Sequence, residues 1–432
     1  MQMNIFSDIY ARLIGKAILI PVLLAAIFAC EQVEQQGPKR VFIVYSIGYN
    51  NLSSYLKEDI EDLEKSYSSI GGNNHVVVFS HSTKGKSNYT TPNPPVVFSF
   101  RKLGSGKVVR DTLMVMEPNT VSASAETLRE VLTFIQDRYQ EAEYSILFSS
   151  HGTGWAPADY CNRADEYENS YSGLQMRMGR QTTGREPYWG VVPEDGGPVV
   201  KSFGVQNITS NTYHEMDITD MADAFPMKVK TLIFDACFMG GIETAYELSD
   251  VAQTVIASQT EILADGMDYT SMLKYIFRDN LKGFCENYFN YYNSQSGAYQ
   301  SATISMIDCS RLEPLARICR EIFEIQREQI ASLEGSYEVQ RYYRRSYSSE
   351  HKWFYDLEDI IMHTEASEEQ IEALKTALEG CVTYKAATEH FINDITITAH
   401  SGLSMYLPYA DRRYLNDFYK TLKWNKATGL VK

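Results

Sequence analysis

The chain has 432 residues, with 40 Lys and Arg against 55 Asp and Glu, so its formal net charge at pH 7 is -15. An acidic balance of this size argues against nucleic-acid binding, which depends on basic surfaces, and is compatible with cationic substrates. A chain of this length exceeds one ordinary single-core domain, so we expect a core with an accessory region.

The first 39 residues have the pattern of an export segment. Basic residues precede an apolar run over 17–29, and Cys30 follows it directly. The run is shorter than the ~20 apolar residues of a membrane span and is typical of a signal-peptide core. Ile27-Phe-Ala-Cys30 approximates a bacterial lipobox, so we predict a signal peptide over 1–29, lipidation of Cys30 and a polar tether over 30–39. The alternative is an ordinary signal peptide, with Cys30 incidental and the protein periplasmic or secreted.

The segment after the tether alternates between strand and helix patterns. Short apolar runs predict strands, and longer runs with apolar residues three and four positions apart predict helices. This alternation favours a largely parallel sheet covered by helices on both faces. Two of the strands, separated by a Gly-Ser-Gly turn, form a predicted hairpin at the sheet edge. The predicted strands lie at 40–46, 75–80, 96–100, 107–116 and 144–150, and the predicted helices at 52–65 and 124–139.

Two predicted strands are followed by a pair of residues suited to nucleophilic catalysis. His151 and Gly152 follow the strand over 144–150, and Asp235-Ala-Cys237 follows the apolar run over 232–234. Ligands of α/β sheets bind at the carboxyl ends of the strands, and a helix starting after Cys237 would favour its thiolate. A cysteine nucleophile needs a nearby imidazole and N–H donors for an oxyanion, for which Gly152 and Cys237 are the candidates. The simpler alternative is a buried structural cysteine and a hydrogen-bonded structural histidine.

Between 155 and 218 the chain loses its periodicity and is rich in Gly, Asn, Ser, Tyr and charged residues. A loop of this length inside a compact domain is usually functional or disordered. A helix is predicted next, over 213–224, and leads to the strand before Cys237. The insertion carries four arginines, Arg163, Arg177, Arg180 and Arg185.

The ordered set of motifs resembles the clostripain family of cysteine peptidases, which belongs to the caspase-like clan with gingipains and legumains. His151-Gly152 and Asp235-Ala-Cys237 resemble the family's two catalytic motifs. The resemblance extends over about residues 40 to 408 and implies a caspase-like fold, with a mostly parallel central sheet flanked by helices. Three further similarities are the strand and Asn-Asn-Leu turn over 41–52, the strand over 255–259 and the Gly-Leu-Ser strand over 401–408.

The resemblance also implies a specificity and a form of activation. In the family, the loop after 259 forms the pocket for the residue before the cleaved bond. Asp265 is our first candidate to pair there with an Arg or Lys side chain, and Asp268 is the second, because a carboxylate suits a guanidinium group. Asp235 either orients this pocket or ends its strand, and the alternative for Asp265 is a carboxylate that only solvates its loop. Related linkers are cut to activate the enzyme, which makes the four arginines of the insertion candidate self-cleavage sites; the alternative is a surface insertion with incidental arginines.

The second half of the chain is predicted to complete the core and add an accessory region. We place the catalytic core at 40–270 and a mixed, largely helical region at 271–432, which contributes a late core strand within 395–407. The six cysteines after Cys30 show no C-x-x-C spacing, so neither a zinc site nor a particular disulfide is indicated. Some members of the family use calcium, but no D-x-[DN]-x-[DN]-G loop is present, so we predict no cofactor. Helices are predicted at 311–333 and 365–378, and a further strand at 302–307.

The leading hypothesis is an exported, monomeric cysteine endopeptidase that acts on basic peptides through a His151/Cys237 dyad and contacts the membrane only through a lipid anchor. The competing hypothesis is a caspase-fold surface lipoprotein that binds peptide or glycan without turnover. The intact His-Gly and Asp-Ala-Cys motifs count against it, because a binding module needs neither. A different α/β hydrolase would carry a motif such as G-x-S-x-G, and the sequence has none.

Overall fold

The computed structural model describes residues 39–85, 91–171, 182–183, 206–209, 212–344 and 353–432. The predicted signal peptide, the tether and Cys30 lie outside the described residues, as do Arg177, Arg180 and Arg185. Within these ranges, we find no helix that combines the length and the apolar character needed to cross a membrane.

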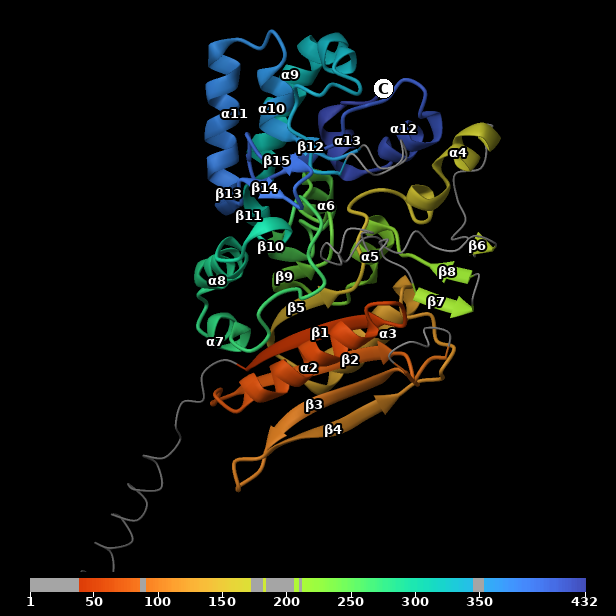
Figure 1. Cartoon of the computed structure of the whole chain (residues 1–432), viewed down its shortest axis with the longest axis vertical. Coiled ribbons are helices and arrows are strands. Elements are labelled where there is room, and N and C mark those ends of the chain that lie inside the picture. The colour runs from red at the N-terminus through yellow and green to blue at the C-terminus, as the bar shows by residue number, and fades with distance from the viewer. Residues whose placement is uncertain (1–38, 86–90, 172–181, 184–205, 210–211, 345–352) are drawn as a thin grey trace, which may run out of the picture.

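One sheet runs through the centre of the molecule (Figure 1). Its nine strands, in chain order, are β1 (Arg40–Gly48), β2 (Asn74–Ser82), β3 (Val96–Lys102), β4 (Val108–Val115), β5 (Glu143–Ser149), β9 (Val229–Asp235), β10 (Ala252–Ala257), β11 (Thr303–Asp308) and β13 (Val382–Ala387). They pair in the order β13-β11-β10-β9-β5-β1-β2-β3-β4. The five central strands are parallel, and only β3 and β11 run in the opposite direction. The predicted mostly parallel sheet with a hairpin at its edge is therefore confirmed.

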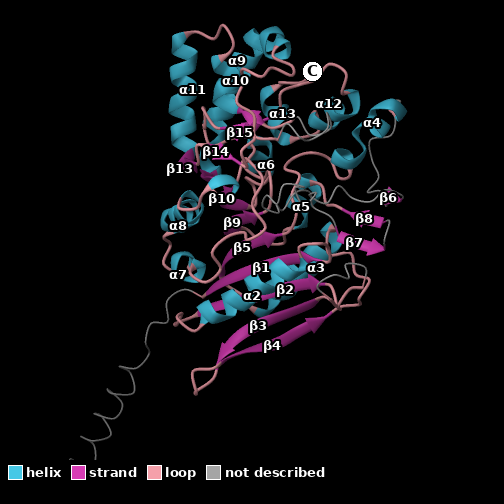
Figure 2. Cartoon of the chain, in the orientation of Figure 1, coloured by secondary structure: helices cyan, strands magenta, loops and turns pink. Residues whose placement is uncertain are grey.

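Helices cover both faces of this sheet, as Figure 2 shows. The apolar residues of β1, β5 and β9 are almost all buried, as expected of parallel strands with both faces covered. The first face packs against α2 (Ser53–Tyr67), α7 (Met272–Ile276) and α8 (Leu281–Asn293). The apolar core on the second face includes residues of α3 (Ala125–Arg138), α5 (Ile218–Ala224), α6 (Ile242–Glu247), α9 (Leu312–Ser332) and α11 (Glu368–Cys381). It continues into α10 (Leu357–Met362), α12 (Arg413–Tyr419) and α13 (Lys423–Thr428), which pack on other helices and on a small sheet.

The remaining elements are short. Within the insertion, the structure describes α4 (Tyr160–Ser170) and a small sheet of β6 (Thr182–Thr183), β8 (Thr212–His214) and β7 (Gln206–Thr209). Two further two-stranded sheets are β12 (Tyr355–Asp356) with β16 (Ser404–Met405) and β14 (His390–Phe391) with β15 (Ile395–Thr396).

Three expectations about boundaries are corrected by the structure. The late core strand is β13 and not the segment 395–407, which instead contributes β15 and β16 to the small sheets. The core does not end at 270, because β11 and β13 both belong to the central sheet. The helix predicted over 213–224 begins only at Ile218, because the preceding residues form β8 and a turn.

The C-terminal region is tied to the helix after Cys237 through a buried carboxylate. Glu243 in α6 is fully buried, and its Oε1 accepts the Tyr406 N–H at 2.7 Å and the Tyr419 hydroxyl at 2.8 Å. Its Oε2 and the Ser404 hydroxyl lie within 3.3 Å of the place that a Cβ on Gly241 would occupy, and neither atom has a hydrogen-bond partner in the described part. Burial raises the pKa of Glu243 from the ordinary value of 4.5 to about 7.

This raised pKa predicts a pH-dependent stability. Between about pH 4.5 and 7 the carboxyl of Glu243 holds a proton in the folded protein that it has released in the unfolded chain. Its contribution to the free energy of unfolding is therefore present at low pH and is lost as the pH rises through 7. We expect Glu243→Gln to stabilise the protein relative to wild type at pH 8, by up to ~3 kcal/mol, and to change it much less at pH 4.5. Urea unfolding of both proteins at the two pH values measures this, with the exposed Glu372→Gln as the matched control. Parallel pH profiles for wild type and Glu243→Gln would contradict the prediction.

Candidate active site

His151 and Cys237 follow neighbouring strands at the same edge of the sheet. In the parallel ladder between β5 and β9, Ser149 is the register partner of Asp235, so both residues lie two positions beyond this pair. Parallel strands present their carboxyl ends at one edge, which is where α/β sheets bind ligands. The structure thus brings together the two strand ends that carry the predicted dyad.

The main chain of Gly152 packs directly against Cys237. A Cβ built on Gly152 would lie 2.5 Å from the Cys237 carbonyl oxygen and 3.1 Å from the Cys237 nitrogen. Contacts this short exclude any side chain, so only glycine allows the approach. The close packing places the two predicted oxyanion donors, the N–H groups of Gly152 and Cys237, on adjoining segments of backbone.

The Cys237 thiol is fully buried and lies against the loop that follows β10. The Ile262 N–H donates to Sγ at 3.1 Å, and Sγ lies 3.8 Å from the Ile262 carbonyl oxygen. The two contacts with the Ile262 main chain fix the position of the sulfur. The helix expected to start directly after Cys237 does not start there, because α6 begins only at Ile242 and a turn separates it from Cys237.

The turn after Cys237 is held in an unusual conformation by the same loop. Phe238 has a φ of 60°, which costs a non-glycine residue ~1–3 kcal/mol. Its N–H donates to Thr260 O at 3.0 Å, and its ring stacks on Phe354 with centroids 4.7 Å apart. Gly240 donates to Ser258 O at 2.8 Å, and a Cβ there would lie 2.7 Å from the Ser258 carbonyl carbon.

A buried ion pair fixes this loop to the C-terminal region. The Arg344 guanidinium donates to both carboxylate oxygens of Glu261, at 2.7 and 3.1 Å, and the two side chains are only 11% and 1% exposed. Bidentate pairs of this kind fix orientation as well as charge. Glu261 immediately precedes Ile262, so the pair positions the residue whose N–H contacts the sulfur.

Asn51 is a site residue that the sequence analysis missed. Its Oδ1 lies 2.8 Å from His151 Nε2, so the amide oxygen accepts the ring N–H and leaves Nδ1 as the nitrogen that can take a proton. A signal was present, because Asn51 belongs to the Asn-Asn-Leu turn after the first strand. That strand, β1, is paired with β5, and their carboxyl ends share one edge.

The three candidate substrate carboxylates differ in their surroundings. Asp265 is exposed in the loop after β10. Asp268 is half-buried; burial alone would raise its pKa, but hydrogen bonds from Ser271, Thr270 and Asn287 lower it below the ordinary value. Asp235 is fully buried, and its Oδ2 accepts hydroxyl groups from Ser149 at 3.1 Å and Tyr269 at 2.8 Å.

A buried tyrosine lies near both Asp235 and Cys237. The pKa of Tyr288 is raised well above its ordinary value by burial first, then by the charges of Asp235 and Cys237. Its hydroxyl has no hydrogen-bond partner among the residues that the structure describes. The first sheet face, covered by α8, therefore carries a carboxylate and a phenol beside the thiol.

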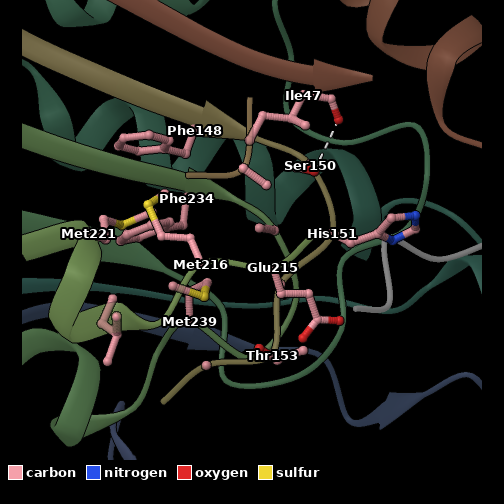
Figure 3. Close-up of a pocket in the computed structure, with 15 residues that line it drawn as sticks. Ile47, Phe148, Ser150, His151, Thr153, Glu215, Met216, Met221, Phe234 and Met239 are labelled. Carbon is pink, nitrogen blue, oxygen red and sulfur yellow. Dashed lines mark hydrogen bonds between the residues drawn. The ribbon is translucent and has the colours of Figure 1, made fainter. Parts of the chain in front are cut away.

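A pocket opens on the other side of the Cys237 turn. It is lined mainly by apolar side chains from β5, β9 and α5. Figure 3 shows His151 and Thr153 at its margin and Phe148, Met216 and Met239 around its centre, with the His151 ring directed away from the methionines. Cys237 is not part of its lining.

Other features bear on cofactors and processing. In the described ranges, no group of three or more His, Cys, Asp or Glu side chains is arranged to hold a metal ion. The six cysteines after Cys30 are all buried, and within the described residues none of them forms a disulfide. Arg163 lies inside α4, where it forms ion pairs with Asp159 and Glu166.

The arrangement is suited to acyl transfer. A thiol that receives an N–H, an imidazole with one nitrogen fixed by an amide, and two adjoining backbone N–H groups are the parts that such chemistry needs.

Comparisons with known proteins agree with this geometry. The chain is similar in structure to an inactive zymogen C11 protease from Parabacteroides distasonis, with a TM-score of 0.71, 25% identity, and coverage of 90% of this chain and 98% of that one. It also resembles a secreted C11 cysteine protease from Bacteroides thetaiotaomicron, with a TM-score of 0.68, 23% identity, and coverage of 90% and 99%. A third similar structure is that of a secreted C11 cysteine protease from the same species in complex with an irreversible peptide inhibitor. It has a TM-score of 0.69 and 20% identity, with coverage of 90% of this chain and 98% of that one. No curated protein matches the chain.

The sequence profile of the clostripain family matches residues 44–176 and 195–429, which is most of the chain. The two matched segments include both strand ends described above, with His151 in the first and Cys237 in the second. The chain therefore belongs to the clostripain family and is a cysteine endopeptidase.

Proposed function

We propose that the protein is an exported endopeptidase that hydrolyses peptide bonds after Arg or Lys through a Cys237/His151 dyad. The observation that carries the proposal is the packing of Gly152 against Cys237, which sets the His-Gly and Asp-Ala-Cys motifs side by side. The alternative, a caspase-fold lipoprotein that binds peptide or glycan without turnover, does not account for an N–H directed at the buried sulfur.

The proposed reaction uses protein groups and water only. The Cys237 thiolate attacks the scissile carbonyl, forming an S–C bond, and the N–H groups of Gly152 and Cys237 stabilise the oxyanion. His151 donates a proton to the leaving amine as the C–N bond breaks. Water, deprotonated by the same imidazole, then hydrolyses the thioester and restores the thiol.

For the basic side chain before the cleaved bond, we propose Asp265 as the partner. Asp265 is exposed and lies three residues beyond Ile262, so it is within ~10 Å of the residue that contacts the sulfur. Asp268 is the weaker candidate, since hydrogen bonds from its own loop and α8 engage its carboxylate. Asp235 lies nearer the thiol but is buried, and it would need its tyrosine neighbours to move.

Turnover of paired Arg-ended and Lys-ended peptide reporters tests the proposal. Wild type should cleave both, with or without added calcium, and Cys237→Ala should cleave neither. Asp265→Asn should lower kcat/KM by roughly tenfold or more, because a hydrogen bond to a charged group is worth ~1.5–3 kcal/mol. Thiol alkylation of Cys237 should change little in this variant, which separates substrate binding from damage to the nucleophile.

The matched variants Asp235→Asn and Asp268→Asn identify the carboxylate. If only Asp235→Asn lowers kcat/KM, the carboxylate that pairs with the basic side chain would be Asp235, on the first sheet face beside Tyr288. Full activity in all three variants would overturn the basic preference while leaving the dyad in place. Wild type that cleaves no reporter and binds peptides equally well as Cys237→Ala would favour the non-catalytic alternative.

Asn51 gives a separate prediction about the imidazole. Asn51→Ala removes the acceptor for Nε2–H, so we expect kcat/KM to fall roughly two- to tenfold, equivalent to ~0.5–1.5 kcal/mol. Asn51→Asp places a negative charge beside His151 and should raise its pKa, which moves the histidine limb of the pH–rate profile to higher pH. Identical pH profiles for wild type and Asn51→Asp would show that Asn51 does not position the ring.

We further propose that the chain is cut within the insertion, after Arg177, Arg180 or Arg185. Arg163 is less suited, because it is ion-paired within α4. Such a cut would leave the two parts together: the Ala158 N–H donates to Asp217 at 2.6 Å, the Asp159 N–H donates to Glu215 at 2.6 Å, and β5 remains paired with β9.

Incubation of wild type beside Cys237→Ala checks this processing. We expect two fragments from wild type under denaturing conditions, a single elution peak under native conditions, and an intact Cys237→Ala chain. A wild type that is fully active as one chain would remove the activating role.

Export and anchoring complete the proposal. The pattern over 1–30 supports a signal peptide with lipidation of Cys30, and a structural relative is described as secreted. We propose peptide or protein substrates, a monomer, no nucleic-acid partner, and membrane attachment through the lipid alone.

A further inference from the structure

We infer that the pocket beside His151 binds an apolar side chain of the substrate on the amine side of the cleaved bond, at its first or second residue. The inference rests on the proposed dyad and adds a second determinant of specificity to it. Its starting point is the location of the pocket, which is lined in part by His151 and Gly152 but not by Cys237.

The direction of the reaction decides which part of the substrate meets this pocket. His151 must lie beside the leaving nitrogen in order to protonate it. The residues that follow this nitrogen therefore leave past His151, Gly152 and Thr153, which form one wall of the pocket. None of Cys237, Asp235, Asp265 or Asp268 lines it, so it is separate from the candidate sites for the residue before the cleaved bond.

The chemistry of the lining selects an apolar side chain. Phe148 and Phe234 come from the second face of the sheet, Met239 from the turn after Cys237, and Met216 and Met221 from the segment before α5 and from α5 itself. Methionine side chains are flexible and polarisable, so they adapt to aliphatic and aromatic groups of different shape.

The polar groups at the rim are already engaged within the protein. Ser150 donates its hydroxyl to Ile47 O at 3.0 Å, which Figure 3 marks with a dashed line. Glu215 accepts the Asp159 N–H at 2.6 Å. An acidic substrate side chain would therefore lose its hydration beside the Glu215 carboxylate, which is costly, whereas an apolar one would gain from leaving water.

Internally quenched peptides test the inference. They share one acyl half ending in Arg and carry Leu, Met, Phe, Gly or Asp at each of the two positions after it. We expect kcat/KM for the best apolar residue to exceed that for Gly or Asp by roughly tenfold or more at one of the two positions. Equal rates across the set, or a preference for Asp, would overturn the inference.

Variants assign the preference to the pocket. Met221→Trp should fill it and bring the apolar-to-Gly ratio to within about twofold of unity. Met216→Ala should widen it and shift the preference toward Phe, which keeps the test usable if Met221→Trp does not fold. The exposed Met362→Trp on α10, outside the pocket, is the matched control and should retain the wild-type ratio. An unchanged ratio in both folded pocket variants would place the preference elsewhere.

A short reporter separates this inference from the proposed function. An Arg amide of a small fluorophore has no residue after the cleaved bond, so its turnover reports the dyad alone. Failure of wild type to cleave this reporter and every peptide would refute the proposed function. Cleavage of the reporter together with indifference to the residues after Arg would refute only the pocket.

Discussion

The parallel pairing of β5 with β9 is the constraint on which the active site depends. The ladder pairs Ser149 with Asp235, and this register alone sets His151 level with Cys237. A slip of one residue would turn every side chain of a strand to the opposite face and would expose the buried rows on either side. The contact of Gly152 with Cys237 then brings the two main chains closer than any larger residue would permit. The juxtaposition of the two motifs is thus a consequence of the sheet register and of the absence of a side chain at Gly152.

Cys237, the proposed nucleophile, is held in place by parts of the chain that lie far from it in sequence. The loop after β10 contacts the turn after Cys237 through Ser258, Thr260 and Ile262. Glu261 is almost completely buried in that loop, and a buried carboxylate is costly unless it is paired. Arg344 supplies the partner from the C-terminal region. The region that the sequence predicts to be an accessory region therefore holds the loop that contacts Cys237, and it also supplies β11 and β13 to the central sheet.

The sequence predicts strands where an apolar pattern reflects burial, and it does not reveal contacts that join distant segments. Continuous apolar runs identify β1, β5 and β9, because strands covered on both faces must be apolar on both. The edge strand β13 was missed, since the residues of Val382–Ala387 are partly or fully exposed and include polar side chains, so they form no apolar run. The apolar run Leu403–Leu407 was assigned to the sheet, but it is buried against α6 instead, with Ser404 donating to Gly240 O. Asn51 and Arg344 act through partners 100 and 83 positions away, which no local pattern encodes.

The two proposed specificity sites lie on opposite faces of the sheet. On one face, Tyr269 donates to the buried Asp235, and Asp265, the proposed partner of a cationic side chain, lies exposed in the loop after β10. On the other face, β5, β9 and α5 present phenylalanine and methionine side chains beside His151. In the proposed function, the scissile bond would lie between Cys237 and His151, so its acyl side and its amine side would meet different faces of the sheet. The two preferences can therefore change independently, since the residues that would set them belong to separate layers packed on opposite sides of the same strands.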